Sequence, residues 1–521
     1  MKARFLIPLL SLSAVPLLVL TALQPDPDPV PKAPPTATVS QDDPSAVITA
    51  EDMYNRIYFL ASDALMGRDT PSQGLEAAAA YLASEHRRLG LEGGAEDGSF
   101  YQRWPYRLLG PDLAAVSLTL EGEAGQRSLQ PGRDMAVRGA LEDELDAELV
   151  FVESTEGDPV EGSMEGQVAV FAFPMAEGWD QPARARAQRQ ASWAAASGAV
   201  ASLHILDEEV SGDDLEALSQ QLASPGRVMG WNLPFPQIFV SGTAAAEAIE
   251  GIERVAAAGA SDALSLEGRL TGEIPVEIHD DAHPPNVVAM IRGSDPELRD
   301  EYVVLSAHMD HVGTGQPMNG DTIYNGADDN ASGTAALIET ARAISYMDEA
   351  PRRSVVFVHV SGEERGLLGS RWFVENPPMP VEQMVANINA DMIGSDAHPD
   401  TLVVIGKEYS TLGPLVDQIN ESMPELGLVT SDDLWPEQRF FYRSDQYNFM
   451  RMEIPSLFFF TGVHECYHRP CDTVDFIDPD KAARIARLLT LSVLEIANAD
   501  ARPEWDPAGL AEVRELTGAG R

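Results

Sequence analysis

Residues 302–333 decide the fold and read YVVLSAHMDHVGTGQPMNGDTIYNGADDNASG. The apolar run 302–307 has the length and the β-branched content of a buried strand. It ends directly in the tetrapeptide HMDH, and a Gly- and Asn-rich loop then leads into a helical pattern near Ser332. Imidazoles and carboxylates therefore lie at the carboxyl end of a strand, where open α/β sheets bind ligands. The alternative is an acidic surface loop with incidental histidines, and the remaining chain decides between them.

The overall charge excludes one class of function. The chain has 521 residues, enough for two or three domains with a sizeable core. It carries 36 basic and 82 acidic side chains, a formal net charge of −46. Such a surface repels phosphate backbones, so no nucleic-acid partner is expected. The charge favours solubility but does not indicate a function.

The amino-terminal segment is predicted to lie outside the folded body. Residues 1–23 place two basic residues ahead of an apolar run, as in a secretory signal peptide; an uncleaved membrane anchor is the alternative. Residues 24–47 are rich in Pro, Asp and Thr and are typical of an extended linker. We expect an extracytoplasmic body, periplasmic or secreted, of unknown oligomeric state. A local disulfide between Cys466 and Cys471 fits such a compartment, although sequence alone does not fix its geometry.

Three kinds of pattern follow one another along the rest of the chain. Residues 50–90 are helical, and the following residues carry short strands and helices typical of an inserted α+β unit. After residue 286 strands and helices alternate, which predicts a mostly parallel, mixed α/β sheet flanked by helices. The predicted organisation is a main domain over 48–117 and 273–500, an inserted unit over 118–272 and a loose tail over 501–521.

Residues of metal-ligand type follow four of the predicted strands. The 302–307 strand ends at His308, the 354–360 strand at Glu363 and Glu364, the 384–390 strand at Asp391, and the 455–460 strand leads into 464–472. Because the carboxyl ends of parallel strands meet at one edge, we expect these side chains to lie together. Imidazoles and carboxylates without a thiolate run suit Zn²⁺ in a hydrolytic site, and more than three ligands favour two ions. Of two adjacent glutamates, one can bind metal while the other acts as general base.

These strand ends lie in motifs that resemble the co-catalytic di-zinc aminopeptidase family, which includes bacterial leucyl aminopeptidases and glutamate carboxypeptidase II. The motifs HMD, GADDNASG, GEERGLLGS, NADMIG and YHRPCDTVD occur in the order and spacing of that family. The resemblance covers residues 286–475 closely and extends to LASDALMGR within the helices at 51–95. It implies a zinc exopeptidase-like fold, and the inserted unit resembles a protease-associated domain.

The resemblance implies a ligand for each of two zinc ions. Asp329 would bridge both ions. His308 and Asp391 would complete the set for one ion, and Glu364 and His468 the set for the other.

Further roles are implied beside the metals. Glu363 would be the general base, Tyr467 would polarise the substrate carbonyl, and Asp310 would orient His308. The segment FFYRSDQYNF has Gln446 where many relatives have a histidine, so the resemblance does not define the details of the substrate subsites.

A competing motif lies at 464–468, where HECYH fits the H-E-x-x-H pattern of helical single-zinc proteases. That chemistry requires both histidines on one helical face. The segment follows an aromatic strand, and Pro470 comes two residues after the second histidine, so no helix is expected. His464 and His311 are interpreted as supporting or structural residues, and Asp472 as a brace of the loop.

The expected function is that of a zinc-dependent aminopeptidase that removes N-terminal residues from peptides, with Glu363 as general base. A carboxypeptidase or dipeptidase on the same scaffold is the alternative, for which Arg443 could hold a terminal carboxylate. A glutaminyl cyclase is disfavoured because the five-ligand set is complete. A receptor-like binding protein without activity is the alternative from another class, and missing ligands would favour it.

Overall fold

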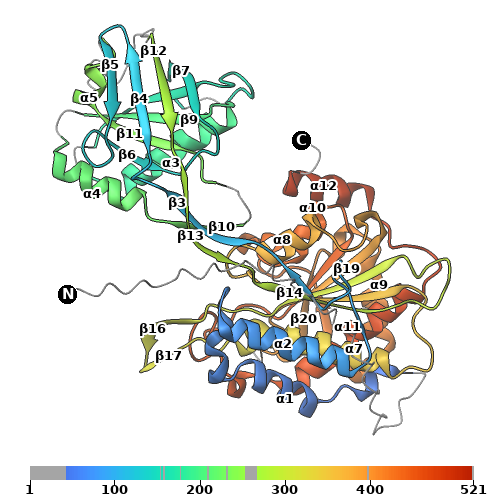
Figure 1. Cartoon of the computed structure of the whole chain (residues 1–521). Helices are drawn as coiled ribbons and strands as arrows, with labels where there is room; N and C mark the ends of the chain where they lie inside the picture. The colour runs from blue at the N-terminus through green and yellow to red at the C-terminus, as the bar shows by residue number, and fades with distance from the viewer. Residues whose placement is uncertain are drawn as a thin grey trace, which may run out of the picture.

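The structure is a computed structural model that describes residues 43–518 apart from 153, 156–158, 176–177, 208–209, 230–232, 251, 253–266 and 396–397. The predicted signal peptide and most of the predicted linker lie outside the described residues. The chain forms a larger body, made from both ends of the sequence, and a smaller body made from its middle (Figure 1). Among the described residues, no helix combines the length and apolar character needed to cross a membrane.

A nine-stranded mixed sheet forms the centre of the larger body, with the order β1-β14-β18-β15-β19-β22-β20-β21 and with β2 also paired to β14. The four central strands run parallel: β18 (Ser354–Val360), β15 (Tyr302–His308), β19 (Met384–Ala390) and β22 (Ser456–Phe460). Antiparallel pairs flank them, through β14 (Pro285–Ile291) on β18 and β20 (Thr401–Ile405) on β22. The outer strands are β1 (Glu92–Gly93), β2 (Tyr101–Arg103) and β21 (Val429–Ser431).

Helices cover both faces of this sheet (Figure 1). One face packs against α1 (Ala50–Leu60), α2 (Gln73–Arg88), α7 (Gly333–Ser345), α9 (Leu412–Ser422) and α11 (Pro479–Asn498). The other face packs against α8 (Leu368–Glu375) and α10 (Gln446–Arg451). Neighbouring strand residues therefore enter opposite cores, as Val303 and Val304 do. This burial on both faces explains the continuous apolar runs of the central strands, and the predicted α/β class is confirmed.

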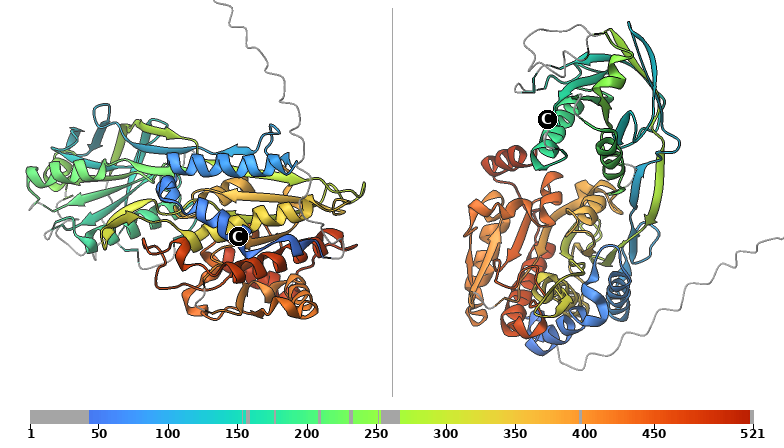
Figure 2. Two further views of the ribbon diagram at one scale, coloured as in Figure 1. Left: turned by 90° about the horizontal axis from the view of Figure 1, so that it is seen from below. Right: turned by 90° about the vertical axis from the view of Figure 1, so that its left-hand side faces the viewer.

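The smaller body is the inserted unit, which has its own sheet and core (Figure 2). Its strand order is β5-β4-β12-β7-β8-β9-β11-β6. The strands are β4 (Ser117–Gly122), β5 (Gly125–Leu129), β6 (Met135–Arg138), β7 (Leu145–Phe151), β8 (Val168–Phe173), β9 (Ala201–Leu206), β11 (Gln237–Ser241) and β12 (Gly268–Glu273). Its helices are α3 (Gln181–Ala196), α4 (Gly212–Leu222) and α5 (Gly242–Ala246). The likeness to a protease-associated domain stays a prediction.

A three-stranded stem joins the two bodies (Figure 1). In it, β3 (Tyr106–Pro111) pairs antiparallel with β10 (Gly226–Met229) on one side and β13 (Val276–Ala282) on the other. A separate hairpin of β16 (Thr314–Met318) and β17 (Asp321–Ile323) projects from the larger body.

The foot of the stem contacts the loop that follows β18. Trp104 is fully buried there, and its Nε1 donates a hydrogen bond of 3.0 Å to Oγ of Ser361. Its ring covers Gly362, which has φ +75° and where a Cβ atom would lie 2.9 Å from the ring. Only glycine fits both the backbone angle and this close approach. The stem therefore packs directly on the residues that precede Glu363.

The prediction of a loose tail over 501–521 is wrong for its central part, which forms α12 (Pro507–Thr517). The Asp506 side chain accepts hydrogen bonds from two N–H groups of the first turn, and Pro507 occupies the first helical position. Val513 is fully buried in an aromatic cluster of the larger body. The Pro- and Gly-containing composition concealed a capped helix with one anchoring side chain.

We expect Val513→Asp to release α12 from the larger body. An unpaired buried charge costs about 3–5 kcal/mol, more than the docking of one short helix can offset. Trypsin should then cleave at Arg514 much faster than in the unmodified protein. Ala511→Asp places the same carboxylate on an exposed position of α12 and is the matched control; equal cleavage rates in the two variants would contradict the docking.

Candidate metal centre

Two groups of ligand-type side chains lie at the carboxyl edge of the central strands. The first group contains His308, Glu363 and Asp391; the second contains His311, Asp329, Glu364 and His468. Within each group the ligand atoms all lie within 4.8 Å of one another. The structure thus brings together all the residues for which the sequence implied metal binding, and it adds His311.

Asp329 stands between the two groups. Its Oδ1 lies 3.2 Å from Nε2 of His308, and its Oδ2 lies 3.1 Å from Nε2 of His468. Its N–H group donates to the carboxylate of Asp472 at 3.1 Å, which fixes the turn before α7. Burial alone would raise its pKa, but the facing imidazoles, His311 foremost, hold the pKa of Asp329 well below its ordinary value. One ionised carboxylate therefore lies between the two groups of ligand-type side chains.

The first group is aligned by a chain of hydrogen bonds. Nε2 of His308 lies 3.2 Å from Oδ1 of Asp391 and 4.0 Å from Oε2 of Glu363. The other oxygen of Asp391 accepts from Oγ of Ser444 at 2.7 Å, and Ser444 accepts in turn from the Asn389 amide at 2.7 Å. Such outer partners fix the orientation of a metal ligand.

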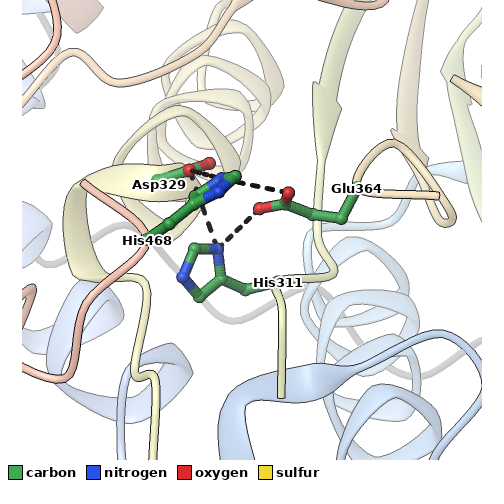
Figure 3. A group of neighbouring side chains, drawn as sticks. All are labelled: His311, Asp329, Glu364 and His468. Atoms are coloured by element: carbon green, nitrogen blue, oxygen red, sulfur yellow. Dashed lines mark ion pairs between the residues drawn. The ribbon is translucent and has the colours of Figure 1, made fainter. Parts of the chain in front are cut away.

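The second group is assembled around Glu364 (Figure 3). Its Oε2 lies 3.1 Å from Nε2 of His468, and its Oε1 lies 2.8 Å from Nδ1 of His311. Burial alone would lower the pKa of His468, but hydrogen bonds to Asp329 and Glu364 raise it to about 10. The imidazole is therefore held firmly against two carboxylates that can share a cation with it.

The HECYH stretch forms a turn, not a helix, so its two histidines do not share a helical face. A disulfide between Cys466 and Cys471 brackets His468, which has φ +54°. His464 belongs to neither group, and its Nε2 lies 3.3 Å from Oδ2 of Asp328. This geometry excludes the single-zinc helical motif.

Asp310 lies behind His308, but its carboxylate acts mainly on the neighbouring loop. Nδ1 of His308 is 3.2 Å from the main-chain oxygen of Asp310 and 3.8 Å from its carboxylate. That carboxylate accepts from the N–H of Gly362 at 2.8 Å and from the hydroxyl of Thr70 at 2.9 Å. Burial raises the pKa of Asp310 to about 6. The main-chain oxygen of Asp310, and not its carboxylate as predicted, therefore orients His308. The carboxylate instead fixes the loop that carries Glu363.

A pocket opens beside the first group. Its polar wall is formed by His308, Asp329, Glu363 and Asp391, and its apolar wall by Met392, Phe440, Phe458, Phe460 and Val463. Arg443 and Tyr467 complete the lining. The Arg443 guanidinium lies 4.7 Å from the centre of the Phe440 ring and 3.4 Å from the Tyr467 hydroxyl.

The residues present fit zinc. Imidazoles and carboxylates without thiolates match hydrolytic zinc sites. Bond lengths of about 2.0–2.1 Å place the ligand atoms of a tetrahedral zinc roughly 3.3 Å apart, close to the separations of 3.1–3.2 Å observed around His308 and His468. Buried Nδ1 of His311 and Oε1 of Glu364 lie 2.8 Å apart, and a cation bound there would satisfy both atoms.

Sequence reasoning missed His311 because no local pattern indicates it. Strand alternation would send residues 308 and 311 to opposite faces. The strand ends at His308, however, and the turn that follows brings His311 back toward Glu364. Only the folded loop reveals this contact.

Two groups of ligand-type side chains that meet at Asp329 suit a metal-dependent hydrolytic site. Residues 286–493 match the model of Peptidase family M28. The resemblance inferred from the five motifs is confirmed.

Curated relatives are similar in sequence to part of this chain. A probable leucine aminopeptidase of Arthroderma otae is 26% identical over 253 residues, which are 46% of this chain and 65% of the relative. The leupeptin-inactivating enzyme 1 of Streptomyces exfoliatus is 34% identical over 111 residues, 21% of this chain and 23% of the relative. The chain thus spans less than two thirds of the length of these curated relatives.

Solved structures are similar over most of the chain. An aminopeptidase from Aneurinibacillus sp. strain AM-1 is 18% identical, with 90% of this chain and 98% of that chain covered and a TM-score of 0.48. A zinc aminopeptidase from Bacillus subtilis is 18% identical, with 87% and 97% covered and a TM-score of 0.46.

We expect Ser444→Ala to weaken zinc binding at the first group. The substitution removes the donor that orients Asp391, and loss of such an outer partner typically costs about 10- to 100-fold in metal affinity. Titration of the chelator-treated protein with zinc, in competition with a coloured chelator, measures this change. Ser492→Ala removes an equally buried serine hydroxyl from α11 and should leave the affinity unchanged. The same affinity in both variants would show that Ser444 has no such role.

Proposed function

We propose that the chain is a zinc-dependent aminopeptidase that holds two zinc ions and hydrolyses the first peptide bond of peptides. One observation carries this proposal: the Glu363 carboxylate stands in the pocket 4.0 Å from His308, beside two ligand groups that share Asp329. Hydrolases use a general base next to a two-metal site to activate water. The match of residues 286–493 to the model of Peptidase family M28 and the names of the fungal relatives support the same reaction.

The ligand atoms suit two ions. His308 and Asp391 would hold one ion, Glu364 and His468 would hold the other, and Asp329 would contact both. Zn²⁺, when bound, supplies Lewis-acid chemistry, since it polarises a carbonyl oxygen and lowers the pKa of water.

Glu363 is suited to carry the proton. Burial raises the pKa of Glu363 well above its ordinary value, and the neighbouring carboxylates of Glu364 and Asp391 raise it further. A carboxylate with such a pKa takes a proton from the attacking water and returns it to the leaving amine. Burial also raises the pKa of Tyr467, so its hydroxyl stays protonated and can donate to the substrate carbonyl.

The pocket suits a peptide with an apolar first residue. The apolar wall, formed by three phenylalanines with a methionine and a valine, can bury an aliphatic or aromatic side chain.

A carboxypeptidase or dipeptidase is the second candidate, because Arg443 lines the pocket and can hold a terminal carboxylate. Two substrates separate the candidates. A leucyl-anilide has a free amine and no carboxylate, whereas an N-acetylated dipeptide has a free carboxylate and no amine. Turnover of the N-acetylated dipeptide alone would replace the aminopeptidase proposal.

We further propose an extracytoplasmic location. The Cys466–Cys471 disulfide supports it, because such bonds persist in oxidising compartments. The apolar segment predicted to direct export lies outside the described residues.

We expect Glu363→Gln to keep both zinc ions and to lower kcat by about 10²- to 10⁴-fold, the usual contribution of a general base. The amide retains the size of the side chain but cannot accept the proton. Metal analysis and anilide turnover measured on the same sample test both parts of this expectation.

An exposed, remote glutamate provides the control, since Glu297→Gln should change neither quantity. Turnover of Glu363→Gln within a factor of a few of the unmodified protein, with both ions bound, would remove Glu363 from the proposed role.

We expect leucyl- and phenylalanyl-anilides to be hydrolysed at least about tenfold faster than the glutamyl-anilide, because one apolar pocket discriminates by roughly 1–3 kcal/mol. The panel is measured on chelator-treated protein with and without added zinc. Activity should appear only with zinc, and equal rates for the three substrates would contradict the apolar subsite.

A further inference from the structure

We propose that His311 is a further zinc ligand, so that the second group holds its ion with four protein side chains while the first ion has three. This inference rests on the proposed two-zinc function and goes beyond it, because it assigns different tasks to the two ions.

The His311 ring points into the second group (Figure 3). Its Nδ1 lies 2.8 Å from Oε1 of Glu364 and 3.7 Å from Oδ2 of Asp329. The ring stands edge-on to that of His468, with 5.5 Å between the ring centres. The ligand atoms of all four residues lie within 4.8 Å of one another. One cation can therefore contact all four.

The nearest polar neighbour of the His311 ring is a carboxylate of the second group, not a side chain that would hold a structural histidine. It is fully buried, its Nδ1 faces Oε1 of Glu364, and its Nε2 has no hydrogen-bond partner within the described ranges. Oε1 of Glu364 has no other partner than this imidazole within the described ranges. The buried His204 of the inserted unit, in contrast, uses both ring nitrogens, on Ser202 and Gln190. Burial of polar atoms with so few partners costs free energy, and a shared cation would satisfy both Nδ1 of His311 and Oε1 of Glu364.

The imidazole is held in place from behind. Gly326 packs against the ring, where a Cβ atom would lie 2.5 Å from Cγ of His311. The N–H group of His311 donates to the main-chain oxygen of Arg68 at 3.3 Å. The buried Arg68 guanidinium donates to the carbonyl groups of Met309 at 2.8 Å and Gly326 at 2.9 Å. The segments on both sides of the ring are thereby clamped, so Nδ1 is preorganised toward the group.

The difference in ligand number separates the tasks of the two ions. Zinc sites with four protein ligands are closed and typically structural, whereas catalytic sites have three and keep a position open. His308, Asp391 and Asp329 supply three ligands next to Glu363, so the open position for water and substrate lies there. The second group, with His311, binds its ion more tightly and holds Asp329 in place.

Zinc binding tests this inference without any measurement of activity. The chelator-treated full chain is titrated with zinc against a coloured chelator. We expect two classes of site in the unmodified protein. In His311→Phe, which keeps the ring volume, the tighter class should weaken by at least about 100-fold, the upper end of what an outer partner costs. His308→Phe is the reciprocal variant and should weaken only the other class.

X-ray absorption of the unmodified protein with one equivalent of zinc gives a second measurement that needs no variant. We expect two imidazoles around the ion, from His311 and His468, and one in His311→Phe. Melting without zinc verifies that the variants are folded, and the spectrum of the unmodified protein decides the question if His311→Phe does not fold.

The outcomes distinguish this inference from the proposed function. Unchanged affinities in His311→Phe, or a single imidazole around the first equivalent of zinc, would overturn the role of His311 and leave the two-zinc proposal intact. Saturation of the unmodified protein at one zinc would overturn the two-zinc proposal itself.

Discussion

The carboxylate of Asp329 is the constraint on which the site depends. Its two oxygens face different imidazoles, 3.2 Å and 3.1 Å away, so its width sets the distance between the two groups. The turn that carries it is tied to Asp472, and α7 begins a few residues later, buried along nearly its whole length. The central strands and this helix thus form a rigid frame around one side chain.

Much of the fold and most of the site could be predicted, because both follow from strand periodicity. Apolar runs marked the central strands, and parallel strands must present their carboxyl ends at one edge; this placed His308 and Asp391 together. The contact between Asp310 and Gly362 and the inward turn of His311 were beyond prediction, since they depend on loop dihedral angles that no spacing encodes. The helix α12 was missed because one buried valine in a polar segment gives a weak periodic signal.

Charge is balanced locally although the whole chain is strongly acidic. Three imidazoles stand among the carboxylates of the two groups, and the buried guanidinium of Arg68 lies behind them. Burial lowers the pKa of Arg68 to about 10, and the nearby carboxylates of Asp310 and Asp472 oppose that shift. Its hydrogen bonds to main-chain carbonyls keep this cation fixed beside the site. The acidity of the surface is therefore separate from the electrostatics of the pocket.

The contact of Trp104 with Ser361 and Gly362 makes the foot of the stem and the loop before Glu363 depend on each other. A chimaera in which the exchanged segment included the stem and position 104 would bring a foreign residue to the foot of the stem, and the loop before Glu363 would lose its cover. Exchange of the loop alone would fail for the same reason, since any residue but glycine at position 362 meets the indole ring. Recombination between relatives is thus compatible with this architecture only where the stem and the loop are exchanged together.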